Sequence, residues 1–114
     1  MPAGDGVEGP DERGFGIHGG WGETSLVLHL RPDLVSLDLA ERAVPDQIAD
    51  FTRIGFAGKP VQFGWLSEDF DSAGVVGDPT GSTAEVGARV AEHLVAEGVA
   101  SLEEISRFFP GAAR

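Results

Sequence analysis

Cysteine is absent from the 114 residues of this sequence, which excludes disulfide bonds, thiolate metal ligands and cysteine nucleophiles. No apolar run approaches the ~18 residues of a membrane-spanning helix, and residues 1–16 lack the basic and apolar stretches of a signal peptide. Basic residues are few, since 8 Lys and Arg against 19 Asp and Glu give a net charge of −11. Such a polyanion is repelled by phosphate backbones and anionic lipids. We therefore expect a cytoplasmic protein with no nucleic-acid or membrane partner.

The composition that remains is that of one small globular domain, with 41% hydrophobic and 24% charged residues. Residues 1–16 are rich in glycine and proline, which disfavour regular structure, so we predict a flexible N-terminal segment there. We expect the folded domain over residues 17–110 and a short tail over residues 111–114.

Residues 21–30 are compatible with either a strand or a short helix. Three alternating leucines would suit a strand. Glu23 and Thr24 suit the first turn of a helix, and Pro32 ends one because the residue before proline avoids helical backbone angles. We therefore predict a helix. Further along the chain, the alternation of residues 61–66 predicts a strand, and a helical turn is expected near residues 46–51.

A long amphipathic helix is predicted towards the C-terminus. Ser82 and Glu85 have the spacing of a capping box, in which each side chain bonds the backbone N–H of the other residue. Gly98 leaves open whether one helix or two follow, and Pro110 with Gly111 should end the element. The chain hardly supplies a layer to cover the apolar face, so we expect self-association into a homo-oligomer. The apolar residues at helical spacing are Val86, Val90, Leu94, Val99, Leu102, Ile105 and Phe109.

Three histidines are candidates for proton transfer or metal binding, and His18 is the most suggestive. We expect His93 on the helix surface and His29 as an ordinary structural residue. His18 lies among four glycines within residues 16–22, and Glu23 follows closely. Such a loop lets a substrate approach the backbone, while an imidazole and a carboxylate can transfer protons or bind a metal. A chance histidine in a glycine-rich loop is the alternative, and two ligands do not complete a metal site.

Two motifs resemble those of a known family. The stretch from His18 to Leu26 resembles the H-A/G-G-x-x-E-T-S-hydrophobic motif of the creatininase family, and residues 31–35 follow it as in many members. Residues 74–87 resemble the G-V-x-G-D-P-T-x-x-T-A-E-x-G signature that precedes the family's C-terminal helix. The resemblance runs from His18 to Phe109.

The resemblance implies a fold and an activity. It implies an α/β protein, with this chain as the C-terminal portion of a three-layer α/β/α fold that ends in a long helix. It implies hydrolysis of a non-peptide or cyclic amide C–N bond in a small-molecule substrate, creatinine being the namesake. It also implies a divalent metal pair of zinc, manganese or iron, which activates water and polarises the carbonyl group.

The same resemblance implies roles for single residues. His18 matches the family histidine near the substrate and is expected to transfer a proton or orient the substrate. Glu23 matches the motif carboxylate and is expected to be catalytic, either as a metal ligand or as a residue that contacts the metal ligands. Trp21 is expected either to line a substrate pocket or to pack in the core. Asp78 is expected to be structural, accepting backbone N–H groups around Thr80.

The motifs that supply most metal ligands in full-length members are absent: an E-x-H-G-P-H-like motif, a downstream aspartate and an N-G-H-G-G-N-like motif. Three explanations stay open: a truncated or mis-started gene product, a half that pairs with a separately encoded N-terminal half, and a degenerate remnant. We expect a fragment that is inactive alone. The competing interpretation is a non-catalytic remnant or interaction module without the metal site.

Overall fold

The computed structural model describes residues 8–56, 58–71 and 73–111. Within these ranges the α-helices are α1 (Trp21–Leu30), α2 (Asp46–Ala49) and α3 (Ala84–Arg107). The 3₁₀ turns are η1 (Pro32–Leu34), η2 (Leu37–Leu39) and η3 (Ser67–Asp69). None of the helices in the described part is both long and apolar enough to cross a bilayer.

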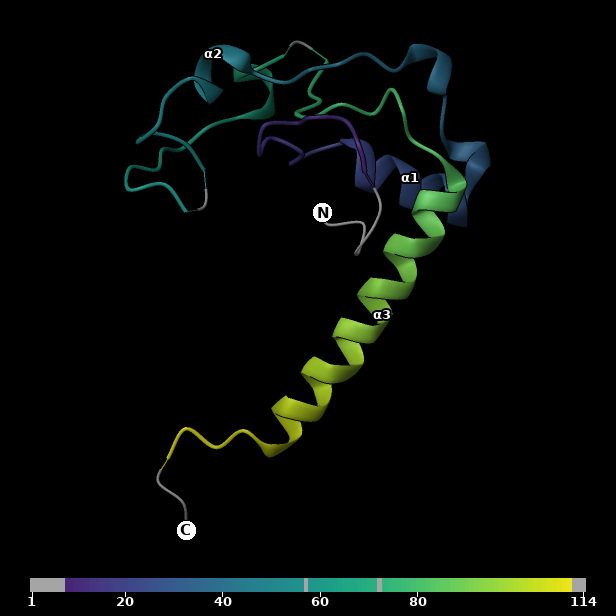
Figure 1. Cartoon of the computed structure of the whole chain (residues 1–114), viewed down its shortest axis with the longest axis vertical. Helices are drawn as coiled ribbons and strands as arrows, with labels where there is room; N and C mark the ends of the chain where they lie inside the picture. Colours follow the sequence, from purple (N-terminus) through teal and green to yellow (C-terminus); the bar gives the residue numbers. More distant parts are fainter. Residues whose placement is uncertain (1–7, 57, 72, 112–114) are drawn as a thin grey trace.

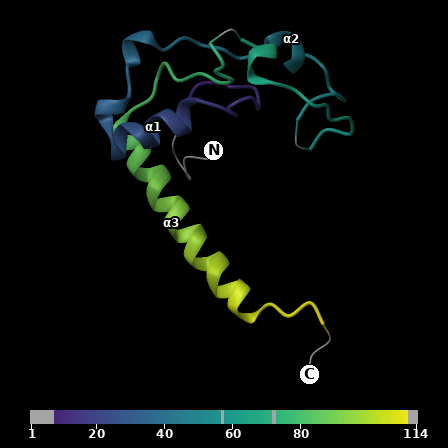
Figure 2. The same ribbon diagram turned by 180° about the vertical axis from the view of Figure 1, so that it is seen from behind.

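The molecule has the shape of an open hook, as Figure 1 and Figure 2 show. Helices α1 and α2 and the long loops form a head, and α3 starts against α1 and then runs away from the head. The Cα radius of gyration is 16.9 Å, whereas a compact domain of this length would have about 13 Å. The chain therefore leaves much of its apolar surface without a covering layer.

Helix α1 has the predicted bounds, which confirms the helical interpretation of residues 21–30. Glu23 lies in the first turn, where a carboxylate interacts favourably with the free N–H groups of the helix start. Arg31 leaves the helical region with φ −147°, as expected for a residue before proline, and Pro32 begins η1. The start of α1 follows directly on Gly20, so Glu23 lies one turn away from the histidine loop.

Helix α3 is one continuous helix of 24 residues that passes through Gly98 and ends at Arg107. Its N-cap is Thr83, whose hydroxyl accepts from the N–H of Val86. The predicted capping box at Ser82 and Glu85 is therefore wrong by one residue. The buried Ser82 hydroxyl instead donates to the carbonyl of Trp21, 3.2 Å away, so a tertiary contact takes the side chain that was expected to cap.

Helices α1 and α3 cross with their backbones in close contact at Gly87. A Cβ atom at this position would lie 1.8 Å from the carbonyl oxygen of Ser25, which leaves no room for any side chain. The close crossing buries Trp21 and Val90 against each other, with Leu26 and Val86 packed beside them. Glycine is required here because the two backbones touch.

A second core cluster joins the N-terminal segment to the rest of the head. Phe15, Val44 and Val76 are its buried members, and Phe15 is only 6% exposed. The ring of Phe56 lies 4.9 Å from that of Phe15 and 5.0 Å from that of Trp65, measured between centroids. Phe15 thus belongs to the core although it lies in the predicted flexible segment 1–16. Residues 1–7 of that segment and 112–114 of the tail lie outside the described residues, and the domain boundary at residue 17 stays a prediction.

The described ranges contain isolated β-bridges and no strand. The bridges pair His18 with Val76 and Ala43 with Gly77 in antiparallel fashion, so the 76–77 segment runs between two other extended segments. The strand predicted over residues 61–66 is wrong, because only Val61 forms a bridge and no neighbouring segment continues the ladder. The described residues accordingly do not form a three-layer α/β/α arrangement by themselves.

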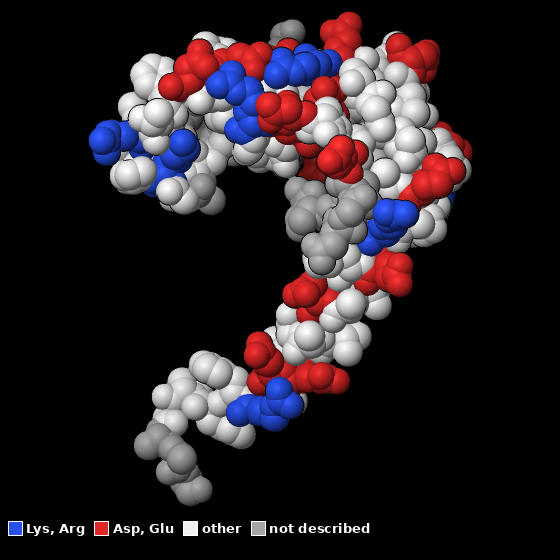
Figure 3. Space-filling model, viewed as in Figure 1, with Lys and Arg blue, Asp and Glu red and all other residues white. Residues whose placement is uncertain are grey.

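The outer two-thirds of α3 presents an exposed apolar stripe, as the pattern of the sequence led us to expect. Figure 3 shows uncharged surface interleaved with acidic side chains along this helix. The described head does not cover these residues, so the stripe is free to pack against another layer. Its exposed apolar members are Leu94, Val95, Val99, Leu102 and Ile105, followed by Phe108 and Phe109.

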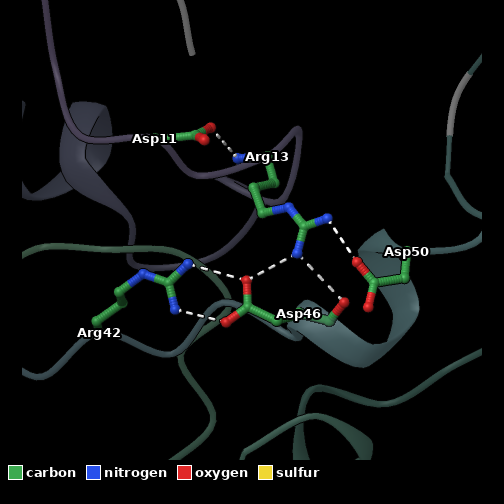
Figure 4. Close-up of polar contacts among 5 residues, drawn as sticks. All are labelled: Asp11, Arg13, Arg42, Asp46 and Asp50. Atoms are coloured by element: carbon green, nitrogen blue, oxygen red, sulfur yellow. Dashed lines mark hydrogen bonds and ion pairs between the residues drawn. The ribbon is translucent and has the colours of Figure 1, made fainter.

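An ion-pair network ties the N-terminal segment to α2, as Figure 4 shows. Arg13 donates to Asp46 at 3.1 Å and to Asp50 at 2.8 Å, and Arg42 donates to both oxygens of Asp46. Hydrogen bonds from Arg42, and to a smaller extent from Arg13, hold the pKa of the Asp46 carboxyl well below its ordinary value. The network thus links chain segments that are 33 residues apart.

Replacing Asp46 with asparagine is expected to lower the thermal unfolding midpoint slightly at neutral pH. A depressed carboxyl pKa stabilises the folded state above the ordinary value of 3.8, and that contribution is lost as the pH falls through the folded-state value. The difference in thermal unfolding midpoint between the parent and the Asp46→Asn variant should therefore become smaller below about pH 4. The effect is small because the groups are exposed to water.

Asp33→Asn is the matched control, because Arg31 also lowers the pKa of Asp33 but the pair lies within one exposed turn. Thermal melts of the three proteins across a pH series would measure both effects. If both variants lowered the thermal midpoint equally at every pH, Asp46 would have no role in joining the N-terminal segment to α2.

Candidate functional site

The backbone of the histidine loop is anchored to the 76–77 segment. The N–H groups of Ile17 and His18 donate to the carbonyl of Val76 at 2.9 and 3.1 Å, and the N–H of Val76 donates to the carbonyl of His18 at 2.8 Å. His18 itself is an exposed residue. The loop therefore has a defined backbone position while the imidazole stays accessible to solvent and to a small molecule.

A tight turn at Gly19 places Glu23 beside the same loop. The Glu23 carboxylate accepts a hydrogen bond from the N–H of Gly19, and the Thr24 hydroxyl donates to the Gly19 carbonyl at 3.2 Å. Gly19 has φ +67°, a left-handed conformation that glycine adopts without strain. The turn thus holds a half-buried carboxylate next to the residue that follows His18. The described contacts include no direct hydrogen bond or ion pair between the His18 and Glu23 side chains.

Glu23 also lines an open depression of about 460 Å³ on the head. Its wall is mostly aliphatic, and Glu23, Thr24 and Ser36 supply polar groups. Small-molecule sites usually have this character and fall in the range of ~300–1,000 Å³. The depression lies between α1, the two 3₁₀ turns after it and the 75–79 segment, and its aliphatic lining includes Val27, Leu34, Leu37, Val75 and Pro79.

Trp21 is a core residue in this structure. It is 8% exposed, its ring contacts the Val90 cluster, and its indole N–H donates to the carbonyl of Gly81 at 3.1 Å. A buried indole with a satisfied N–H has no free face for a ligand. This geometry favours the packing alternative over a substrate-binding role for Trp21.

Asp78 makes the local contacts that the sequence predicts for it. It is 7% exposed, and its carboxylate accepts from both the N–H and the hydroxyl of Thr80, at 3.1 and 2.5 Å. These bonds close the turn that leads to α3. The structural interpretation of Asp78 is therefore confirmed.

Glu12 is a residue of this region that reasoning from the sequence missed. Its carboxylate accepts from the N–H of Asp78 at 2.8 Å and from the N–H of Trp21 at 3.4 Å. It therefore contacts both the start of α1 and the loop before α3. The available signal was the set of glycines around His18: Gly16 and Gly20 leave room for the Glu12 carboxylate, and Gly19 forms the turn.

The other histidines lie away from this turn along the chain, His29 in α1 and His93 in α3. Among the residues that the structure describes, no three His, Asp or Glu side chains gather in a way that could hold a metal ion. The candidate residues of this chain are therefore Glu23, which lines the depression, and His18, which lies on the loop just before it.

The Gly19 turn thus places the Glu23 carboxylate at the wall of an open depression, while the exposed His18 precedes this turn and is not among the lining residues. The profile of the family described as Creatininase, creatinine amidohydrolase, matches residues 2–102. No curated protein and no solved structure matches the chain. The chain belongs to the creatininase family, which confirms the resemblance carried by its two motifs.

Family membership implies an α/β fold and an amidohydrolase, and members generally use a divalent metal. The match includes most of residues 1–16, so the family domain extends further towards the N-terminus than the two motifs alone indicated. This agrees with the core position of Phe15 and the contacts of Glu12.

Proposed function

We propose that this chain supplies the proton-transfer part of a creatininase-family site that hydrolyses the C–N bond of a small, non-peptide or cyclic amide. The observation that supports the proposal is the Gly19 turn, which holds the Glu23 carboxylate beside the loop that carries His18, at the edge of the open depression. His18 would give a proton to the leaving nitrogen or orient the amide. Glu23 retains acceptor capacity beyond the Gly19 N–H, because a carboxylate has about four lone-pair sites.

The side chains in the described part of the chain do not fit a divalent metal pair by themselves. Such a centre needs three or more protein ligands per ion or ligands shared between ions, and the described residues gather no such group. We propose that residues outside this chain hold the zinc, manganese or iron pair. On this proposal the chain alone is inactive.

The same proposal accounts for the uncovered apolar stripe of α3. A further layer of the α/β/α fold would bury residues such as Leu102 and Ile105, both 67% exposed. That layer would come either from a separately encoded N-terminal half or from another copy in a homo-oligomer. Each buried aliphatic side chain of this size contributes roughly 1.5–3 kcal/mol, so the covering layer would have a strong effect on stability.

The experiment that tests the proposal begins with the DNA directly upstream of the coding region. An open reading frame with the two missing motifs would be co-expressed with this chain, loaded with zinc, manganese or iron, and assayed on a panel of cyclic and acyclic amides. We expect hydrolysis that requires both parts and is abolished by a chelator. A stable, metal-loaded assembly that hydrolyses no amide would contradict the proposal.

The exposed stripe of α3 also favours a second candidate, a non-catalytic remnant or interaction module. The DNA upstream of the coding region distinguishes the two candidates. An upstream region interrupted by stop codons, with no frame carrying the missing motifs, would favour the remnant over the split or mis-started enzyme.

A further inference from the structure

The Glu12 side chain connects the N-terminal segment, the start of α1 and the loop before α3. One carboxylate oxygen, Oε2, accepts from the N–H of Asp78 at 2.8 Å, across 66 positions of the chain, and from the N–H of Trp21 at 3.4 Å. The carbonyl of Glu12 accepts from the N–H of Phe15 at 2.7 Å, which turns the chain back towards the core. Hydrogen bonds to a charged carboxylate are stronger than those between neutral groups.

Three glycines make room for this carboxylate. A Cβ atom on Gly16, Gly20 or Gly77 would lie 2.6, 2.5 or 2.6 Å from a Glu12 carboxylate oxygen. These distances are too short for any real side chain, so each position needs glycine as long as Glu12 is in place. Gly77 and Gly20 also approach each other, since a Cβ on Gly77 would lie 2.7 Å from the Cα of Gly20. The carboxylate is thus enclosed by the backbone of both motifs that define the family resemblance.

We infer that Glu12 is a positioning residue of the His18–Glu23 site. It holds the Gly16–Gly20 loop, which carries His18, and the first turn of α1, which carries Glu23, against the 77–78 segment. The His18 loop is already bonded to the same segment through Val76, so the contact of Glu12 with Asp78 gives a second point of attachment. The relevance of this role to catalysis rests on the proposed function, whereas the attachment itself does not.

The inference is tested by NMR on the full 114-residue chain, with Glu12→Gln, Glu12→Ala and the control Glu41→Gln, which alters an exposed carboxylate. We expect Glu12→Ala to shift the Gly19 and Asp78 amide resonances and the His18 ring resonances, while the methyl resonances of Val90 in the α1–α3 core stay in place. Glu12→Gln should restore part of the parent pattern, because its amide oxygen can accept the same bonds. A purely structural role would lower the melting midpoint without this local signature.

A double-mutant cycle keeps the test decisive if Glu12→Ala is poorly folded. Gly16→Ala introduces a methyl group whose three nearest neighbours are all atoms of the Glu12 carboxylate. We expect the fall in melting midpoint caused by Gly16→Ala to be roughly halved or less in the Glu12→Ala background, because interacting sites are not additive. Additive midpoint changes, or unchanged Gly19 and His18 resonances in Glu12→Gln and Glu12→Ala alike, would overturn the inference.

Activity distinguishes this inference from the proposed function. In an active assembly, Glu12→Ala should lower kcat by roughly 10–100-fold, as substitutions of residues that support active-site groups do, with little change in KM. If the resonances of the chain change as expected but a stable, metal-loaded assembly hydrolyses no amide, the proposed function is refuted and the positioning role of Glu12 is left intact. An active assembly whose kcat is unaffected by Glu12→Ala would refute the positioning role alone.

Discussion

In an active assembly, His18→Ala should lower kcat by at least about 100-fold, because a positioned acid or base typically contributes 10²–10⁴-fold to the rate. The proton is transferred in the transition state, so KM should change much less than kcat. His18 is suited to this task because its backbone makes two hydrogen bonds to Val76, and Ile17 makes a third, while the residue stays exposed.

His29→Ala is the matched control for this substitution. His29 is an exposed histidine in α1, and alanine keeps the Cβ atom that packs near Gly87. Steady-state kinetics with the two variants would measure kcat and KM separately. If kcat of the His18 variant stayed within twofold of the parent, or if both variants lost activity equally, His18 would have no part in the chemistry.

Gly87→Ala is expected to destabilise the fold strongly. The new Cβ would lie 1.8 Å from the Ser25 carbonyl oxygen and 2.8 Å from the Cβ of His29. The first neighbour is backbone and cannot rotate away, so α1 and α3 would have to separate and expose the buried Trp21–Val90 contact. Overpacking usually costs 1–3 kcal/mol, and we expect about 3 kcal/mol here, a large part of the stability of a small domain.

Gly98→Ala provides a control within the same helix. A Cβ at Gly98 meets no atom within 4 Å, so the substitution adds only helix propensity, worth up to ~1 kcal/mol. Urea or thermal unfolding followed by circular dichroism should therefore show opposite changes, with Gly87→Ala less stable and Gly98→Ala equal to or more stable than the parent. Two variants of equal stability would mean that the α1–α3 crossing is looser than described.

The helices could be predicted from the sequence because their signals are local. Helix α1 begins at a glycine-rich loop and ends before a proline, and α3 follows a cap residue and carries a continuous apolar stripe. The cap itself was misplaced because Ser82 and Thr83 are both good N-caps. Only the tertiary contact of Ser82 with the Trp21 carbonyl decides between them.

The features that could not be predicted depend on contacts between distant segments. Residues 61–66 alternate as a strand would, but a strand exists only where a neighbouring segment pairs with it, and only Val61 is paired. Glu12 lies in a segment whose composition indicates a loop, and its partners are in the 77–78 segment and at the start of α1. The glycines at 16, 20 and 77 were visible, but their common neighbour was not.

His18 and Glu23 could be singled out because the motif places them one glycine turn apart, and the turn at Gly19 does bring the carboxylate back to the loop. Their roles in catalysis remain predictions. Trp21 shows the limit of the motif, because a variable position beside the histidine is occupied here by a core residue.

Measuring the zinc, manganese and iron that stay bound to the purified 114-residue chain after dialysis would test the central claim most directly. We propose that the proton-transferring imidazole and a supporting carboxylate lie in this chain and the metal ligands outside it, so well below one equivalent of metal should remain. Two tightly held equivalents per chain would show that these residues build a complete metal centre by themselves, and would contradict the account.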